Sequence, residues 1–177
     1  MDFAFTAEQE MLRDSLGKLL TQAYSFDQRQ ALLRSGQPHS SAVWAQLRDM
    51  GLLALPFAET EGGLGGSVSD LVAICELLGR HLVVEPYLSS ILLGGRALAL
   101  GGARAGALLE AVIAGEALVA LAHEERHGVG PLALLGTTLE QGRLTGEKRL
   151  VMGGAETVTL IVSARAHDRL VLVMVDP

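Results

Sequence analysis

Five residues in the middle of the chain, His123 to His127, have types and spacing that could do chemistry. They read HEERH, the H-E-x-x-H pattern in which two histidines one helical turn apart bind zinc and the glutamate acts as a general base. Glu140, Glu147 or Glu156 could supply a third zinc ligand. This hypothesis of a zinc hydrolase requires a helix that runs without interruption through the motif.

The residues around HEERH argue against a zinc site. The preceding run LVALA (residues 118–122) is typical of a strand, and the segment from Gly128 to Pro131 would end any helix at once. Ala133 stands where the extended metzincin pattern has its third histidine. We therefore expect no metal in this chain, and we rank the zinc hydrolase last among the candidate functions.

The glycine-rich segment EGGLGG (residues 61–66) lies between two stretches of helical pattern. Its backbone amides could cradle a phosphate at the start of the following helix. A dinucleotide-binding fingerprint, however, follows a strand rather than a helix. We therefore predict a turn between packed helices.

The bulk composition excludes several classes of partner. With a formal net charge of -6 and 4% aromatic residues, the chain is not expected to bind nucleic acid. The apolar region 88–122 is interrupted by charges such as Arg96 and Glu110, so we expect no membrane span. Cys75 is the one cysteine, and the first residues lack the basic and apolar regions of a secretory signal. A cytoplasmic protein is therefore expected.

Helix signals dominate the first part of the chain. Thr6 with Gln9 and Ser67 with Asp70 form capping boxes, each followed by aliphatic residues at helical spacing. The pattern predicts further helices at 26–34, around 43–50, from about 86, and at 104–114. We therefore expect an all-helical domain of about five to six helices over residues 1–115.

After Gly115 the pattern changes to strands. The aliphatic runs LVALA (118–122), VTLIVSA (158–164) and LVLVMV (170–175) are separated by turn-like segments. Strands that follow a block of helices predict an α+β fold, with part of an antiparallel β-domain over residues 116–177. Because the chain ends directly after a strong strand, we expect this β-domain to be truncated.

Several segments, taken in order, resemble the acyl-CoA dehydrogenase family. They are FAFTAEQEMLRDSLGKLL (3–20), WAQLRDMGLLALPFAETEGGLGGSVSDLVAICELLGRHLVVEPY (44–87), IAGE (113–116) and LTGEKRLVMGGAETVTLIVSAR (144–165). The family shows a Trp-containing helix, a G-L-L-x-L segment, a glycine-rich loop and a helix ending in E-x-L-G-R, which Glu76 to Arg80 reproduce. An A-x-G-E turn and an N-G-x-K segment follow in the family. The resemblance therefore covers essentially the whole chain.

This resemblance implies a flavoprotein that oxidises an acyl-CoA to the 2,3-enoyl-CoA. FAD accepts a hydride from the β-carbon while a carboxylate base removes the α-proton. The family carries that base in a C-terminal helical domain, so no residue of this chain is assigned as catalytic, and the chain alone is expected to be inactive. The implied partners are the acyl-CoA substrate, further subunits in a homo-oligomer or hetero-oligomer, and electron-transfer flavoprotein.

Two segments differ from the family where the family contacts its flavin. The T-E-P-x-x-G-S-D loop corresponds to the segment beginning His123-Glu124, in which Glu124 and Gly128 match the family pattern. The W-I-T segment corresponds to Leu150-Val151-Met152, which lacks the aromatic wall and the threonine hydroxyl. The resemblance assigns FAD contacts to residues from both segments: His123, Glu124, Gly128, Leu150, Val151 and Met152.

Such losses resemble the small subunits of pimeloyl-CoA-type and steroid-degrading acyl-CoA dehydrogenases, in which unlike subunits share the work. A hetero-oligomer with a second acyl-CoA dehydrogenase subunit is the corresponding expectation. The alternative is a non-catalytic structural subunit that keeps the helical domain for assembly and has lost its cofactor. Flavin content distinguishes these two functions.

Overall fold

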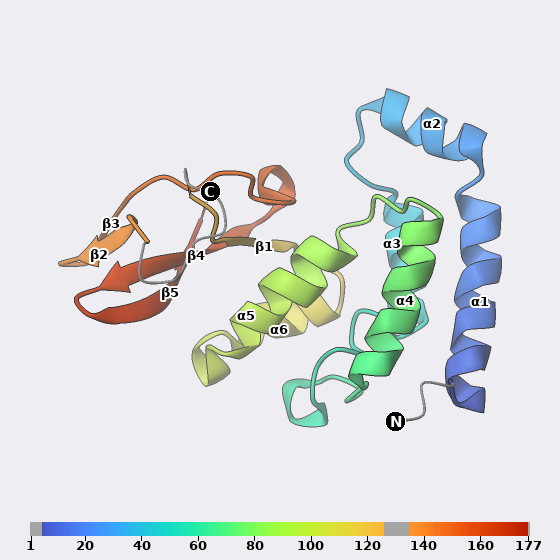
Figure 1. Ribbon diagram of the computed structural model, residues 1–177, viewed down its shortest axis with the longest axis horizontal. Helices are drawn as coiled ribbons and strands as arrows, with labels where there is room; N and C mark the ends of the chain where they lie inside the picture. The colour runs from blue at the N-terminus through green and yellow to red at the C-terminus, as the bar shows by residue number, and fades with distance from the viewer. Residues whose placement is uncertain (1–4, 126–134, 177) are drawn as a thin grey trace. The chain divides into compact units, whose positions relative to one another are not determined.

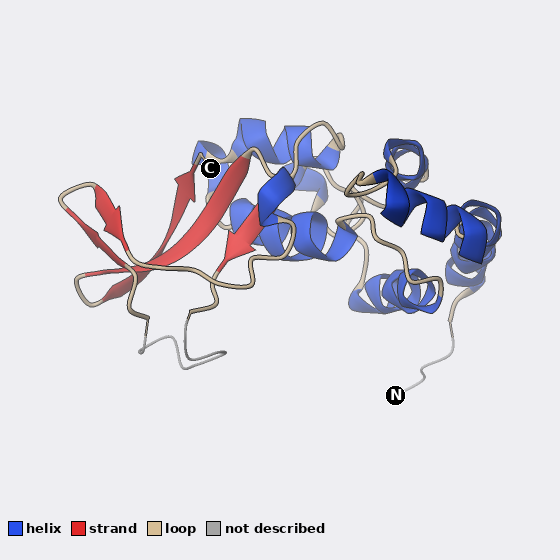
Figure 2. Ribbon diagram, turned by 90° about the horizontal axis from the view of Figure 1, so that it is seen from above, coloured by secondary structure: helices blue, strands red, loops and turns tan. Residues whose placement is uncertain are grey.

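The chain folds as two compact units, Met1–Glu85 and Pro86–Pro177. The computed structural model describes residues 5–125 and 135–176. Within the described residues, the first unit is helical and the second combines helices with a sheet of five strands (Figures 1 and 2). The predicted α+β fold class is therefore confirmed.

The first unit is built from four α-helices and a short 3-10 helix in its described part. These elements are α1 (Ala7–Ala23), α2 (Phe26–Ser35), α3 (Ser41–Asp49), η1 (Glu59–Glu61) and α4 (Val68–Arg80). Capping boxes begin α1 at Thr6 and α4 at Ser67, as the sequence predicts, and a further capping box begins α2 at Ser25. In each box the side-chain oxygen accepts a backbone hydrogen bond that the first turn of a helix otherwise leaves unmade.

The core of the first unit lies between its helices. Leu16 and Leu20 on α1, Leu47 on α3 and Ile74 on α4 are at most 1% exposed. Full burial of such a side chain contributes about 1.5–3 kcal/mol. Across the same face, the Gln9 amide donates a 2.8 Å hydrogen bond to the Asp70 carboxylate, which joins the first turns of α1 and α4.

The glycine-rich segment before α4 is a turn, as predicted. A Cβ atom at Gly63 would lie 2.1 Å from the carbonyl oxygen of Phe57, and one at Gly66 would lie 2.6 Å from the side chain of Leu55. Gly62 and Gly65 have φ angles of 84° and 66°, which glycine adopts without strain. Close packing of the backbone therefore explains these glycines without a phosphate.

The second unit begins with helical segments. They are the π-helix η2 (Tyr87–Gly95), α5 (Arg96–Ala99), the 3-10 helix η3 (Gly102–Arg104) and α6 (Gly106–Ile113). Small residues let η2 pack directly on the first strand, β1 (Val119–Ala122). A Cβ atom at Gly94 would lie 2.8 Å from the backbone oxygen of Val119, and the Ser90 hydroxyl accepts a 3.0 Å hydrogen bond from the Val119 amide.

The sheet is organised around a long strand, β4 (Thr159–Ala166). The other strands after β1 are β2 (Thr138–Glu140), β3 (Arg143–Thr145) and β5 (Arg169–Val175), and the 3-10 helix η5 (Gly154–Glu156) precedes β4. β5 is antiparallel to β4 and β3 to β2, but β1 and β2 are parallel to β4. The sheet is thus mixed, where the sequence analysis expected antiparallel strands. The long segment between β1 and β4 provides the crossover that a parallel pair requires.

The change from helices to strands lies between the end of α6 at Ile113 and the start of β1 at Val119. The division into domains 1–115 and 116–177 stays a prediction. The two compact units divide the chain by packing instead, and α6 lies in the same unit as the sheet. None of the helices within residues 5–125 and 135–176 combines the length and the hydropathy of a bilayer-spanning segment.

Candidate functional site

The HEERH motif begins where β1 ends. β1 ends at Ala122, and neither His123 nor Glu124 lies in a helix or strand. The zinc hypothesis is therefore wrong in its central requirement, a continuous helix, because the β-prone run before His123 pairs with β4 instead. His127 and Gly128 lie outside the described residues.

The two segments expected to contact a flavin lie side by side. The Arg149 amide donates a 2.9 Å hydrogen bond to the carbonyl oxygen of Glu124. The ammonium group of Lys148 donates a 3.1 Å hydrogen bond to the carbonyl oxygen of His123. The structure thus brings His123 and Glu124 next to the segment that begins Leu150-Val151-Met152.

A partly buried ion pair holds these segments together. Lys148 Nζ lies 2.8 Å from Glu125 Oε1, and the two side chains are 9% and 19% exposed. The same oxygen of Glu125 accepts hydrogen bonds from the hydroxyl and amide of Thr137 at 2.6 and 3.0 Å. The other oxygen accepts a 2.7 Å bond from the Gly136 amide. Both oxygens of the carboxylate therefore accept hydrogen bonds from the protein.

These donors determine the protonation state of Glu125. Burial alone would raise its pKa, but the hydrogen bonds from Lys148, Thr137 and Gly136 lower the pKa from its usual 4.5 to about 2. Glu125 is therefore ionised over the physiological range. Its negative charge compensates the buried ammonium group of Lys148.

The ion pair extends to a serine on β4. Ser163 is 1% exposed, and its hydroxyl accepts a 3.1 Å hydrogen bond from Lys148 Nζ. The same hydroxyl lies 2.9 Å from His123 Nδ1. We refer to Glu125, Lys148, Ser163 and His123 as the polar chain. It connects the end of β1 with β4.

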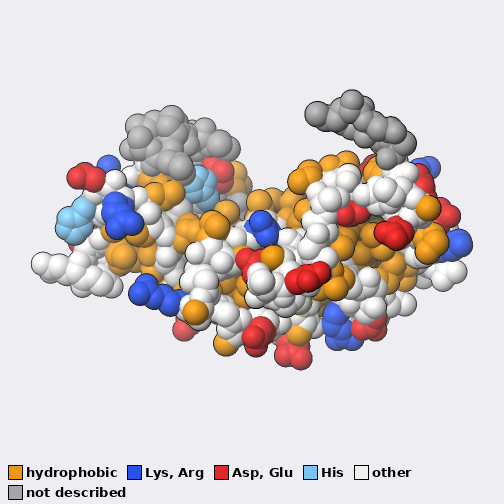
Figure 3. All heavy atoms as spheres, turned by 90° about the horizontal axis from the view of Figure 1, so that it is seen from below, with side chains coloured by type: hydrophobic (Ala, Val, Ile, Leu, Met, Phe, Trp, Pro, Cys, Tyr) orange, Lys and Arg blue, Asp and Glu red, His pale blue; other side chains and the backbone are white. Residues whose placement is uncertain are grey.

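The turn after the polar chain presents apolar side chains to solvent. Leu150 is 89% exposed and has a φ of 51°, a conformation that is uncommon for a residue with a side chain. Met152 is 52% exposed, while Val151 is half-buried. Gly153 lets the turn pack closely against η2, since a Cβ atom at this position would lie 2.9 Å from Ser89 Oγ. Exposed hydrophobic side chains are also visible elsewhere on the surface (Figure 3).

Sequence reasoning did not assign roles to Glu125, Lys148, Thr137 and Ser163. Lys148 lies in the segment that resembles the family's N-G-x-K, so that segment was a usable signal. Ser163 is a hydroxyl residue on an otherwise apolar buried strand, which is a second signal. The pairing of Glu125 with Lys148 depends on tertiary contacts that no local pattern reveals.

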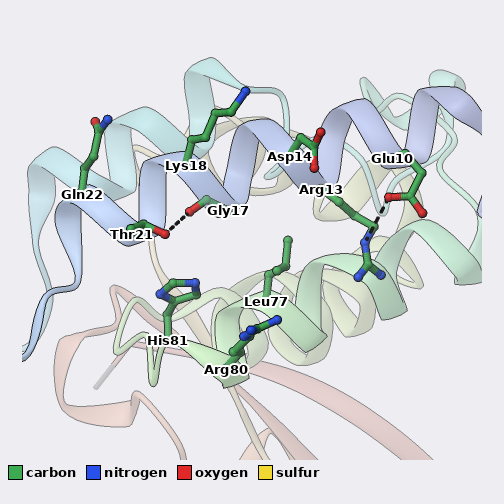
Figure 4. Close-up of a pocket in the computed structure, with 10 residues that line it drawn as sticks. All are labelled: Glu10, Arg13, Asp14, Gly17, Lys18, Thr21, Gln22, Leu77, Arg80 and His81. Carbon is green, nitrogen blue, oxygen red and sulfur yellow. Dashed lines mark hydrogen bonds and ion pairs between the residues drawn. The ribbon is translucent and has the colours of Figure 1, made fainter.

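A separate groove on the first unit lies between α1 and α4 (Figure 4). It encloses about 600 Å³, and Leu77 points from α4 toward α1 within it. Charged side chains of both signs line the groove: Glu10, Arg13, Asp14, Lys18 and Arg80. This mixture gives the groove no donor set suited to a particular ligand, so we do not assign it to the candidate site.

Comparison with known proteins identifies the family. Residues 6–116 match the family described as acyl-CoA dehydrogenase, N-terminal domain. Acyl-CoA dehydrogenase FadE27 of Mycobacterium tuberculosis is 29% identical over 171 residues, which cover 95% of this chain and 45% of FadE27. Acyl-CoA dehydrogenase IpdE2 of the same organism is 30% identical over 140 residues, which cover 78% of this chain and 44% of IpdE2. The chain thus spans about half the length of the curated relatives it matches.

Solved structures agree with this match. A chain of the ChsE4-ChsE5 complex from Mycobacterium tuberculosis superposes with a TM-score of 0.85 at 26% identity, covering 99% of this chain and 49% of that chain. A variant of the Tcur3481-Tcur3483 steroid ACAD gives a TM-score of 0.82 at 30% identity, covering 96% and 48%. The family match extends over more than half of the sequence, and the structural match over nearly all of it. The chain belongs to the acyl-CoA dehydrogenase family.

Proposed function

We propose that this chain is part of an FAD-dependent acyl-CoA dehydrogenase that oxidises an acyl-CoA to the 2,3-enoyl-CoA. The observation that carries the proposal is the hydrogen bond from the Arg149 amide to the Glu124 carbonyl. It joins the two segments that the family resemblance assigns to the flavin. When bound, FAD would supply the hydride acceptor for this reaction.

The residues present fit a flavin in two respects. Leu150 and Met152 offer exposed apolar side chains that could cover part of a flat aromatic ring. The carbonyl oxygen of His123 accepts a hydrogen bond from Lys148, which precedes these residues, and its ring nitrogens can donate or accept a hydrogen bond. His123, Glu124, Leu150, Val151 and Met152 would therefore hold the flavin on this side. Gly128, also assigned to this site, lies outside the described residues.

This chain would position the flavin rather than remove the substrate proton. We assign no catalytic base to its residues, in keeping with the family, which carries the base in a C-terminal helical domain. The partly buried Lys148–Glu125 pair would hold the backbone on which the flavin contacts depend. Removal of the α-proton would then fall to a carboxylate outside these 177 residues.

The relatives suggest the assembly and the substrate class. The ChsE4-ChsE5 and Tcur3481-Tcur3483 structures each combine two named components, and the latter is described as a steroid ACAD. We infer a hetero-oligomer with a second acyl-CoA dehydrogenase subunit, rather than a homo-oligomer, and a steroid acyl-CoA as substrate. Electron-transfer flavoprotein is the electron acceptor that the family resemblance implies.

A second candidate function is a non-catalytic structural subunit. The observation that favours it is the replacement of the family's W-I-T by Leu150-Val151-Met152, which removes the aromatic wall and the threonine hydroxyl. In this case the exposed Leu150 and Met152 would contact another subunit instead of a flavin. The two functions predict different flavin contents.

The visible absorption spectrum of the purified chain tests these functions. It is recorded for the chain alone and for the chain co-expressed with a second acyl-CoA dehydrogenase subunit, and zinc is measured on the same samples. Flavin absorption in a fixed molar ratio to this chain supports the dehydrogenase. Flavin that is absent, or that follows the partner subunit alone, supports the structural subunit. Stoichiometric zinc contradicts both.

A further inference from the structure

The polar chain fixes the hydrogens of Lys148. A lysine ammonium group has three hydrogens to donate and no lone pair with which it could accept a hydrogen bond. Its described acceptors are Glu125 Oε1 at 2.8 Å, the His123 carbonyl oxygen at 3.1 Å and Ser163 Oγ at 3.1 Å. Each hydrogen therefore has one acceptor, and Ser163 receives a hydrogen from Lys148.

The direction of the next hydrogen bond follows from the burial of Ser163. Since this hydroxyl is 1% exposed, its own hydrogen needs an acceptor within the protein. Lys148 cannot accept it. The remaining described partner is His123 Nδ1 at 2.9 Å, so the Ser163 hydroxyl donates to Nδ1.

This direction selects one tautomer of His123. A neutral imidazole with an accepting Nδ1 carries its hydrogen on Nε2. Within residues 5–125 and 135–176, Nε2 has no hydrogen-bond partner. Nε2–H is thus a donor whose orientation is fixed through Ser163 and Lys148, at the position where the family loop has a hydroxyl-bearing threonine.

We propose that Nε2–H of His123 donates a hydrogen bond to an acceptor atom of the flavin, and that Ser163, Lys148 and Glu125 are positioning residues that hold it in this tautomer. The inference rests on the proposed function. It goes beyond that function because it assigns a hydrogen-bond donor to the position of the threonine in the family's T-E-P loop and names the residues that orient this donor.

The tautomer is tested without flavin or activity. The chain is labelled with nitrogen-15 histidine, and the His123 signals are assigned by their loss in His123→Gln. At a pH where the imidazole is neutral, we expect an unprotonated Nδ1 and a protonated Nε2, with the Nδ1 resonance displaced in Ser163→Ala. Thr159→Ala, on the same strand, is the matched control and should leave the signals unchanged. A protonated Nδ1 in the unmodified chain overturns the inference.

Flavin binding tests the donor itself. In the form of the protein that retains flavin, His123→Gln places an amide nitrogen near the position of Nε2, whereas His123→Asn places it near Nδ1. We expect the Kd for added FAD to rise about tenfold in His123→Asn and to stay within about threefold of the original in His123→Gln. Ser163→Ala should weaken binding by about threefold to tenfold.

The outcomes separate this inference from the proposed function. Flavin missing from the unmodified protein, with or without its partner subunit, overturns both. Flavin bound by the unmodified protein and equally by His123→Asn overturns only the role of His123. The flavin absorption maximum provides an additional readout, because loss of a hydrogen bond to the ring displaces it. We expect this displacement in His123→Asn and its absence in Thr159→Ala.

Discussion

Each unit of the chain holds a glutamate that is at least partly buried, but the two carboxylates accept hydrogen bonds from different kinds of donor. Glu85 is 6% exposed and accepts hydrogen bonds from neutral donors, the Tyr24 hydroxyl and the Ser40 amide. Glu125 instead faces the Lys148 ammonium group as well as neutral donors. Neutral donors suffice to connect helices, whereas the cation of the second unit also organises Ser163 and His123. The hydrogen bonds of Glu85 connect helices, whereas those of Glu125 belong to a network that also includes the His123 ring.

The largest loss of stability is expected when the charge of Lys148 is removed. Lys148→Met leaves Glu125 ionised and largely buried without its counter-charge, so we expect the second unit to lose about 3–5 kcal/mol of stability. Hydrogen exchange of the β1 and β4 amides in urea measures this loss. Glu147→Gln, which removes an exposed carboxylate from the same segment, is the control. Exchange rates equal to those of the unmodified chain would mean that the ion pair does not hold these strands together.

Acid should weaken the second unit through the same pair. The folded-state pKa of Glu125 is about 2 and its usual value is 4.5, so between these pH values the unfolded chain binds more protons and stability rises with pH. The contribution, about 3 kcal/mol, is complete above about pH 4.5 and is lost as the pH falls through about 2. Urea unfolding of the second unit at several acid pH values measures it. The dependence should shrink in Lys148→Met and persist in Tyr24→Phe.

The connection in the helical unit should be weaker and should respond to alkali instead. Tyr24→Phe removes the donor to Glu85, and we expect a loss of about 1–2 kcal/mol in the first unit. Burial and the hydrogen bond to Glu85 raise the pKa of Tyr24 above its usual 10.0, so the stability that this pair contributes is present below pH 10.0 and is lost as the pH rises. Fluorescence of the buried Trp44, the single tryptophan, monitors this unit during urea unfolding. A stable Tyr24→Phe variant would show that Glu85 is satisfied without the tyrosine.

An exposed ion pair in the helical unit should have the smallest effect. Arg13 lies 3.1 Å from Glu76, whose side chain is 54% exposed. Glu76→Gln should therefore change the stability of the first unit by less than about 0.5 kcal/mol. The same Trp44 fluorescence assay measures it. A larger loss would show that exposure is a poor guide to the strength of ion pairs between α1 and α4.

Local features of the fold could be predicted from the sequence, and non-local ones could not. The capping boxes at Thr6 and Ser67 involve residues three positions apart, so the helices that follow them were predicted correctly. The parallel pairing of β1 with β4 depends on a crossover between distant segments, which strand patterns do not encode.

The candidate site shows the same limit. The resemblance assigned His123 and Leu150 to the flavin because their segments correspond to family loops, and the structure brings these segments together. That they contact a flavin stays a prediction. The ion pair of Glu125 and Lys148 joins residues 23 positions apart, with no periodicity to mark it. Only the folded chain reveals that these residues organise the site.

All three hydrogens of the Lys148 ammonium group are donated to acceptors, which should make this amine unreactive in the folded chain. The chain has two lysines, and the other, Lys18, is exposed on α1. An amine must give up a hydrogen and expose its lone pair before it attacks an electrophile, and Lys148 is 9% exposed with every hydrogen in use. Acetylating reagents should therefore modify Lys18 rapidly and Lys148 only when the second unit opens. The acetylation rate of Lys148 therefore measures how often the sheet opens.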